Sequence, residues 1–172
     1  MTQETGPAYM ATLYRRPGFM IRRAHQISLA LFEEAAQEFG ITTTQFSVLH
    51  TLRAWPEIDQ VSLCTLIGLD RSTATLVLTT LERNALIERR QDPDDKRRNL
   101  LVLSPQGRAL LERTTPLATA ISGPMGEVLS EAELEQMCAL LGRFVAAYNE
   151  RVRTPLLKDF VPQGRKNSAE AQ

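Results

Sequence analysis

Apolar residues recur every three or four positions along several stretches of the chain, and this spacing is typical of one face of an α-helix. The first such stretch predicts a helix over about Phe19–Phe39, with Pro17 near its first turn and Gly40 at its end. Its apolar stripe is broad, which indicates more than one packing partner. Residues 1–13 carry little pattern, and we expect a frayed start there.

Two more helices are predicted on either side of the middle of the chain. Thr42 and Gln45 have the spacing of a capping box, and the helix that they begin should end before Pro56, which lacks the amide needed to continue it. The segment Ser104–Ala120 predicts another helix, and Pro116 should kink it.

The last helix is predicted after a break at Ser122-Gly123-Pro124, and it begins at a capping box formed by Ser130 and Glu133. Its strongly amphipathic stripe comprises Leu134, Met137, Leu141, Phe144, Tyr148 and Val152. The first and last helices are more apolar than one small domain needs, and an intertwined dimer would use that surface. The polar tail, residues 161–172, is expected to be disordered.

A pair of helices joined by a tight turn is predicted in the middle of the chain. The first covers Leu63–Ile67 with Ser62 as its N-cap, and Gly68 permits the turn. Asp70 can cap the second helix, Arg71–Asn84, because its carboxylate can accept hydrogen bonds from the amides of the first turn. The inward apolar positions of this second helix are Ala74, Val77, Leu78 and Leu81. Its outward face carries Arg71 and short polar side chains, namely Ser72, Thr73, Thr75, Thr79 and Thr80.

Two β-like runs follow, over residues 85–90 and 99–103, and they flank the charged turn QDPDDKRR. Helix, tight turn, helix and charged hairpin together form the outline of a winged helix-turn-helix. The predicted fold class is therefore mainly α with a small β-hairpin wing, a winged helix-turn-helix joined to a helical dimerisation lobe. The outward polar side chains of the second helix would be able to approach base edges or phosphates.

The stretch LDRSTAT…LERNALIERRQDPDDKRRNLLVLSPQGRALL resembles the MarR family of bacterial transcriptional regulators. The most specific motif is Asp95-Lys96-Arg97 in the turn, followed by a strand, Ser104 and Gly107. The resemblance implies a homodimer that binds a palindromic double-stranded DNA operator. It also implies a dimerisation lobe from residues 1–40 and 105–160 and a winged DNA-binding domain from residues 41–104.

In such a protein the second helix enters the major groove and the hairpin enters the flanking minor groove. The predicted DNA contacts are Arg71, Ser72, Thr73, Thr75, Thr79, Lys96, Arg97 and Arg98. The resemblance assigns Arg97 to the minor groove, with Asp95 holding Arg97 or a neighbouring backbone amide; by pattern alone the turn is a solvated hairpin of mutually screening charges. The family often has arginine where this chain has Leu76 and Thr80, so fewer phosphate contacts are expected here.

A site for a small anionic effector is also predicted. Arginines cluster at the start of the first helix, and the alternative for them is a surface patch or salt bridges at the rim of a dimer. Family members bind small, often aromatic, acids between their lobes, and RRPGFMIRRAHQI resembles members that govern breakdown of aromatic acids or their coenzyme A thioesters. The predicted effector-binding residues are Arg16, Phe19, Arg23, His25, Phe46 and His50. By analogy with the family, such an effector would release a repressor from DNA.

Composition narrows the remaining alternatives. Lys+Arg and Asp+Glu both number 20 among 172 residues, so any basic patch must be local and balanced elsewhere. Two cysteines are too few for a disulfide framework, and two histidines are too few for a three-histidine zinc site. We expect no cofactor and no metal. Nothing in the sequence resembles a signal peptide or a membrane span, which predicts a cytoplasmic protein.

Three other function classes are alternatives to DNA binding. The sequence has no Gly-rich phosphate loop, nucleophile elbow or HExxH motif, so an enzyme is not expected. A helical dimer that acts as a protein-interaction adaptor stays open. A regulator that senses thiol oxidation through Cys64 or Cys138 also stays open, although the peroxide-sensing branch of the family keeps a cysteine near the start of its first helix and this chain has none there.

Overall fold

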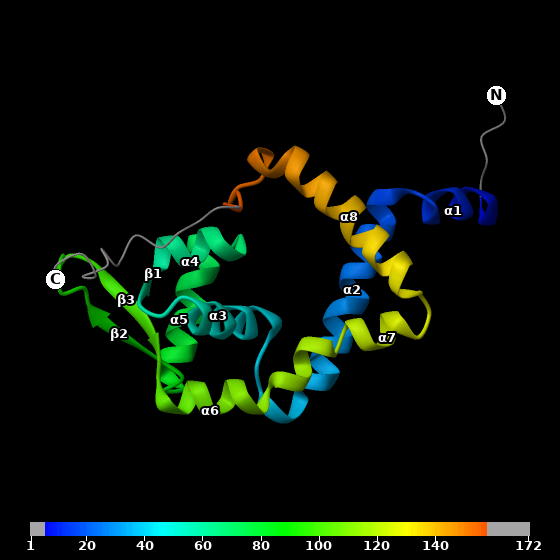
Figure 1. Cartoon of the computed structure of the whole chain (residues 1–172). Helices are drawn as coiled ribbons and strands as arrows, with labels where there is room; N and C mark the ends of the chain where they lie inside the picture. Colours follow the sequence, from blue (N-terminus) through cyan, green and yellow to red (C-terminus); the bar gives the residue numbers. More distant parts are fainter. Residues whose placement is uncertain (1–5, 158–172) are drawn as a thin grey trace.

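A computed structural model of the chain describes residues 6–157, and Figure 1 shows them as two parts. One part holds the three strands with α3, α4, α5 and α6; the other holds α1, α2, α7 and α8. The α-helices are α1 Pro7–Tyr14, α2 Pro17–Ala36, α3 Thr43–Ala54, α4 Gln60–Ile67, α5 Arg71–Arg83, α6 Pro105–Arg113, α7 Ser122–Gly126 and α8 Glu131–Tyr148. The strands are β1 Ile58–Asp59, β2 Ile87–Gln91 and β3 Asn99–Leu103, and short 3₁₀ segments cover Gln37–Phe39, Thr115–Thr119 and Asn149–Arg151. The predicted fold class is confirmed.

The winged part is built around one apolar core. Leu49, Leu63, Leu78 and Leu101, from α3, α4, α5 and β3, are fully buried in it. The chain turns by 112° between α4 and α5, within the range of helix-turn-helix units, and Gly68 makes the turn with a φ of 66°. No single helix in this or any other described part of the chain is long and apolar enough to cross a membrane.

The sheet has one more strand than the sequence predicted. Its order is β1-β3-β2 with both pairs antiparallel, and β1 pairs Ile58 with Leu101. Two residues are too few for an alternating pattern, and their partner lies far along the chain, so periodicity cannot reveal β1. The helix after it also begins earlier than predicted, because Asp59 rather than Ser62 is the N-cap of α4.

Three other expectations about the helices were wrong. Residues 7–14 form α1 where a frayed start was expected, and that helix gathers no clear apolar stripe from which it could be predicted. The predicted helix 104–120 ends at Arg113 and continues as a 3₁₀ segment that contains Pro116. Ser122-Gly123-Pro124 opens the short helix α7 instead of only breaking the chain, because Pro124 lies in its first turn, where no amide is needed.

Apolar side chains of α2 and α8 face outward. A small second core of Phe32, Ala36, Ile41 and Leu117 joins α2 to the winged part. By contrast, α8 has no buried residue within the described chain. We call its exposed side chains and those of α2 the terminal apolar face; it comprises Met20, Ile21, Ile27, Leu140, Leu141, Phe144, Val145 and Tyr148. The tail predicted to be disordered, residues 161–172, lies outside the described residues.

Candidate nucleic-acid interface

The helix predicted to read DNA, α5, is fixed at its start by Asp70. The Asp70 carboxylate accepts from the backbone amides of Ser72 and Thr73 at 3.1 and 3.0 Å and from the Thr73 hydroxyl at 2.6 Å. Hydrogen bonds from the Thr73 side chain and backbone lower the pKa of Asp70 below its ordinary value. The predicted cap is therefore confirmed, and the carboxylate stays ionised at neutral pH.

The two faces of α5 differ sharply. Ala74, Leu78 and Leu81 are fully buried against the core, as predicted, and Val77 is partly buried. On the opposite face Leu76 is 71% exposed, and the predicted DNA contacts on this helix are exposed with it, namely Arg71, Ser72, Thr73, Thr75 and Thr79. A helix held so firmly on one side presents its polar side as a rigid surface.

Some of the outward hydroxyl groups are already engaged. Thr75 Oγ1 donates to the carbonyl of Arg71 at 2.8 Å, and Thr80 Oγ1 donates to the carbonyl of Leu76 at 2.9 Å. Because the hydroxyl hydrogen of each points back along the helix, what these threonines offer outward is oxygen lone pairs and methyl groups. Such groups suit donors on bases and the methyl group of thymine.

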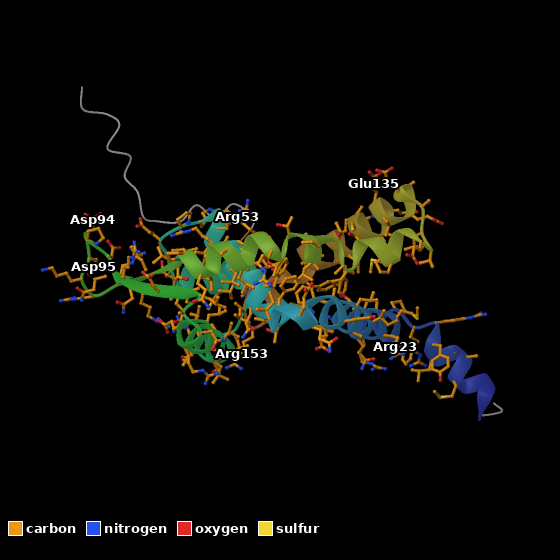
Figure 2. The ribbon with its side chains drawn as sticks, turned by 90° about the horizontal axis from the view of Figure 1, so that it is seen from below. Arg23, Arg53, Asp94, Asp95, Glu135 and Arg153 are labelled. Atoms are coloured by element: carbon orange, nitrogen blue, oxygen red, sulfur yellow. The ribbon has the colours of Figure 1, made fainter. Side chains whose placement is uncertain are left out.

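The wing is the hairpin of β2 and β3, and its turn is closed by local hydrogen bonds. The Asp95 carboxylate accepts from the backbone amide of Arg97 at 3.0 Å, and the Asp95 carbonyl accepts from the amide of Arg98 at 2.9 Å. Asp95 thus holds a backbone amide, one of the two roles predicted for it. Lys96 and Arg97 are exposed. Figure 2 shows Asp94 and Asp95 at the tip of the wing, toward the end of the molecule opposite Arg23.

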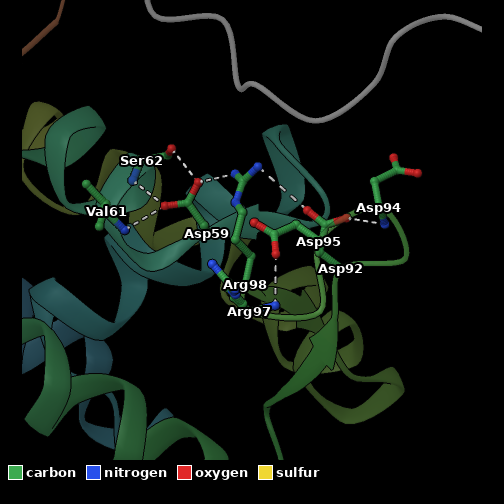
Figure 3. Close-up of polar contacts among 8 residues, drawn as sticks. All are labelled: Asp59, Val61, Ser62, Asp92, Asp94, Asp95, Arg97 and Arg98. Atoms are coloured by element: carbon green, nitrogen blue, oxygen red, sulfur yellow. Dashed lines mark hydrogen bonds and ion pairs between the residues drawn. The ribbon is translucent and has the colours of Figure 1, made fainter.

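Other charges of the wing form ion pairs, some within the wing and some with neighbouring elements. Arg89 Nε lies 2.7 Å from Glu82 of α5, and Arg90 lies 3.0 Å from Glu88. Arg98 is bound by two carboxylates: Nη2 is 2.9 Å from Asp59, and Nη1 is 3.6 Å from Asp92 (Figure 3). Sequence reasoning missed the roles of Asp59 and Asp92. A signal for Asp59 existed, because aspartate ahead of α4 is as good an N-cap as the predicted Ser62. A phosphate contact by Arg98 remains a prediction.

The predicted effector residues do not form one group within the protomer. Phe19 contacts Tyr14, with ring centroids 5.0 Å apart, and these two line a shallow hollow with Arg22, Arg23 and Gln26. Phe46 instead packs against Phe32, which follows Phe19 by 13 residues on the same continuous helix. At 1.5 Å per residue the two positions are about 20 Å apart. These six residues therefore do not line one pocket within a protomer, and their binding of an effector stays a prediction.

His50 has an unusual environment. Its ring lies 4.2 Å from that of Phe46, and its Nε2 is buried with no hydrogen-bond partner among the described residues. Burial, together with the nearby cation Arg53, lowers the pKa of His50 below its ordinary value of 6.5, so the ring is neutral at pH 7. Of the other predicted effector residues, Arg16 and His25 are exposed.

A larger hollow lies elsewhere, between the end of α8 and the turn of the helix-turn-helix. It has a volume of about 590 Å³ and is lined mainly by apolar side chains, among them Ile67, Phe144, Val145, Tyr148 and Leu156. The side chain of Leu156 approaches Gly68, and the Asn149 side-chain amide holds the Leu156 backbone at 2.7 and 2.9 Å. The apolar stripe predicted on the last helix extends to Val152. This was the sequence signal that could have indicated packing at this end of the helix.

The cysteines differ in environment. Cys64 is buried, and its burial raises the pKa of the thiol, which opposes formation of the reactive thiolate. Cys138 is exposed on α8. Within residues 6–157, no group of three or more His, Cys, Asp or Glu side chains could hold a metal ion.

Comparisons with known proteins agree with this architecture. The MarR family profile matches residues 41–98. The HTH-type transcriptional repressor NicR of Pseudomonas putida is 30% identical over 105 residues, which are 61% of this chain and 66% of NicR.

Two solved structures extend the likeness to most of the chain. BpsR of Bordetella bronchiseptica, whose DNA binding is regulated by 6-hydroxynicotinic acid, is 30% identical, with a TM-score of 0.72 over 76% of this chain and 94% of BpsR. The transcriptional repressor CouR, solved on a 23-mer DNA duplex, is 28% identical, with a TM-score of 0.74 over 83% of this chain and 99% of CouR. CouR has also been solved with p-coumaroyl-CoA. These proteins are regulators and not enzymes, and the chain belongs to the MarR family of winged helix-turn-helix transcriptional regulators.

Proposed function

We propose that this protein is a homodimeric repressor that binds a palindromic DNA operator and releases it when a small aromatic acid, or the coenzyme A thioester of one, binds. The observation that carries DNA binding is the exposed polar face of α5, which is backed by fully buried Ala74, Leu78 and Leu81 and flanked by exposed Lys96 and Arg97. This arrangement suits a helix in the major groove and a wing in the minor groove.

The dimer follows from the terminal apolar face. Monomeric soluble proteins rarely leave this many large apolar side chains exposed on two helices. We assign α1, α2, α7 and α8 to a dimerisation lobe and residues 41–104 to the DNA-binding domain; α6, which packs on the core of that domain through Leu111, leads back to the lobe. Two-fold symmetry would place the two α5 helices in successive major grooves, about 34 Å apart. Acting on DNA, the protein would work in the cytoplasm.

Two places could hold the effector. Arg22 and Arg23 beside Phe19 would pair a carboxylate with an aromatic surface, but their hollow is shallow. His50 offers a buried, neutral imidazole next to Phe46 that can donate or accept a hydrogen bond. BpsR and CouR, which respond to or bind an aromatic acid and an aromatic thioester, support this class of ligand. Any such ligand acts only through different affinities for the DNA-bound and free states.

The test begins with the purified protein and fragmented genomic DNA of its source. Sequencing of the bound fragments should reveal an inverted repeat with half-sites about one helical turn apart. Arg97→Ala should weaken binding to that repeat at least tenfold while the protein stays folded and dimeric. Arg113→Ala is the matched control, because it removes the same charge from a guanidinium that lies over Phe39 and is not among the predicted DNA contacts. A dimer with no preference for any duplex would favour the adaptor instead.

Effector binding is tested on the operator found in this way. Aromatic carboxylates and their coenzyme A thioesters would be titrated into the complex while fluorescence anisotropy of the duplex is followed. We expect one of these two classes to release the duplex. If Arg23→Gln or His50→Gln, but not both, abolishes that release, the affected residue holds the ligand. If neither class raises the melting temperature of the free protein or releases the duplex, this part of the proposal is wrong.

A further inference from the structure

Arg98 lies where the wing meets the helix-turn-helix, and Figure 3 shows it between two carboxylates from distant parts of the chain. Its Nη2 lies 2.9 Å from Asp59 Oδ2, and its Nη1 lies 3.6 Å from Asp92 Oδ2. Asp92 directly follows β2, at the start of the turn of the wing, and Asp59 precedes Arg98 by 39 residues. The pair with Asp59 therefore joins the wing to a different element of the fold.

Asp59 is a rigid anchor because α4 fixes its carboxylate. Oδ1 accepts from the backbone amides of Val61 and Ser62 at 2.9 and 3.0 Å, and Oδ2 accepts from the Ser62 hydroxyl at 2.7 Å. The side chains of Asp59 and Arg98 are 19% and 36% exposed, so water screens this ion pair less than it screens the pair of Arg90 and Glu88, which are 58% and 47% exposed. The carboxylate that binds Arg98 is therefore the same one that caps α4.

On the wing side, the backbone of Arg98 is built into the turn that presents Arg97. Its carbonyl accepts from the amide of Asp92 at 3.0 Å, and its amide donates to the Asp95 carbonyl at 2.9 Å. The Asp92 carboxylate in turn accepts from the amide of Asp94 at 2.9 Å. A displacement of the Arg98 guanidinium would therefore be transmitted to both ends of the turn and to its neighbour Arg97.

We propose that Asp59, Arg98 and Asp92 form a positioning device that sets the direction in which the wing holds Lys96 and Arg97 relative to α5. In this arrangement Arg98 acts through Asp59 and does not neutralise a phosphate. The proposal rests on the proposed function, because it assumes that the wing meets DNA. It adds that an acidic residue outside the interface, Asp59, is required for operator affinity.

Charge provides a sharp test, because removal of Asp59 makes the protein more positive. If long-range attraction alone mattered, Asp59→Ser would bind DNA more tightly. Serine preserves an N-cap acceptor for α4 and removes the partner of Arg98. We expect Asp59→Ser to weaken operator binding about tenfold, and Arg98→Gln to weaken it by a similar factor. The double variant should be no weaker than either single variant, since both remove the same contact.

Salt dependence separates positioning from a phosphate contact. A lost phosphate contact lowers the slope of log affinity against log salt by about 0.9. We expect Arg98→Gln to leave that slope unchanged and Lys96→Gln, the matched control, to lower it if Lys96 meets a phosphate. Arg98→Lys should also lose affinity, because an ammonium group cannot bridge two carboxylates as a guanidinium does, whereas a phosphate would accept lysine. A lowered slope for Arg98→Gln with unchanged binding by Asp59→Ser would overturn the proposal.

A measurement without DNA keeps this inference separate from the proposed function. Hydrogen exchange at the amides of Asp94, Arg97 and Arg98 should accelerate in Asp59→Ser, while exchange in the core of α3 stays unchanged. Wild-type protein that binds no duplex would refute the proposed function and leave this readout intact. Wing exchange unchanged in Asp59→Ser would refute the positioning device, whatever the protein does with DNA.

Discussion

Ser104→Ala should destabilise the protein far more than an ordinary helix cap would. The Ser104 hydroxyl donates to the carbonyl of Ala85 at 2.6 Å and accepts from the amide of Gly107 at 2.9 Å, and the residue is 5% exposed. Loss of the cap costs about 1 kcal/mol. The substitution also leaves the Ala85 carbonyl without this partner in a part-buried position, which adds about 1–3 kcal/mol. The expected loss in the free energy of unfolding is therefore about 2–4 kcal/mol.

For a chain of this size, each kcal/mol lowers the melting temperature by about 2–4 °C, so the expected fall is roughly 4–16 °C. Differential scanning calorimetry at one protein concentration measures it, because dimer melting depends on concentration. Ser130→Ala is the matched control: it also removes a capping serine, but from an exposed position where the hydroxyl donates to the nearby Glu133 carboxylate at 2.7 Å. Equal melting temperatures for the two variants would refute the assignment of the larger loss to the bond with Ala85.

Three further predictions concern association, packing and pH. Phe144→Glu should dissociate the dimer in sedimentation experiments, whereas Val128→Glu, at a more exposed position before α8, should not. Gly107→Ala should lower the free energy of unfolding by about 1–3 kcal/mol in urea titrations, because its Cβ would collide with the Leu86 carbonyl, while Gly18→Ala, which meets nothing within 4 Å, should not. Because the pKa of His50 is lowered in the folded state, the unfolded chain binds a proton more readily and stability should fall as pH drops below 6.5. His50→Gln should remove that part of the pH dependence; an identical profile would refute it.

The parts of the fold that the sequence predicted well are those encoded by neighbouring residues. The caps at Thr42, Asp70 and Ser130 involve partners two or three positions away, and all three occur in the structure. The buried face of α5 follows from the 3.6-residue period alone. Such features depend on helix geometry, which the sequence pattern carries directly.

The parts that it did not predict depend on contacts between distant residues. Strand β1 exists because Ile58 meets Leu101, and the anchor of the wing exists because Asp59 meets Arg98. Neither partner is identifiable without the three-dimensional path of the chain. The spread of the predicted effector residues has a different reason: they were chosen by residue type, whereas Phe19 lies 13 positions along α2 from Phe32, the residue that Phe46 contacts.

In α5 the residues that stabilise the fold are separate from those that face outward, and this affects how the regulator can evolve. Stability resides in Ala74, Leu78 and Leu81, while Ser72, Leu76 and Thr79 support no core packing. Surface substitutions of this kind usually change stability by no more than about 0.5 kcal/mol. Mutations can therefore change which operator is recognised, one base contact at a time, while the scaffold stays intact. A duplicated copy of the gene would be free to acquire a new set of target promoters without first acquiring a stabilising mutation.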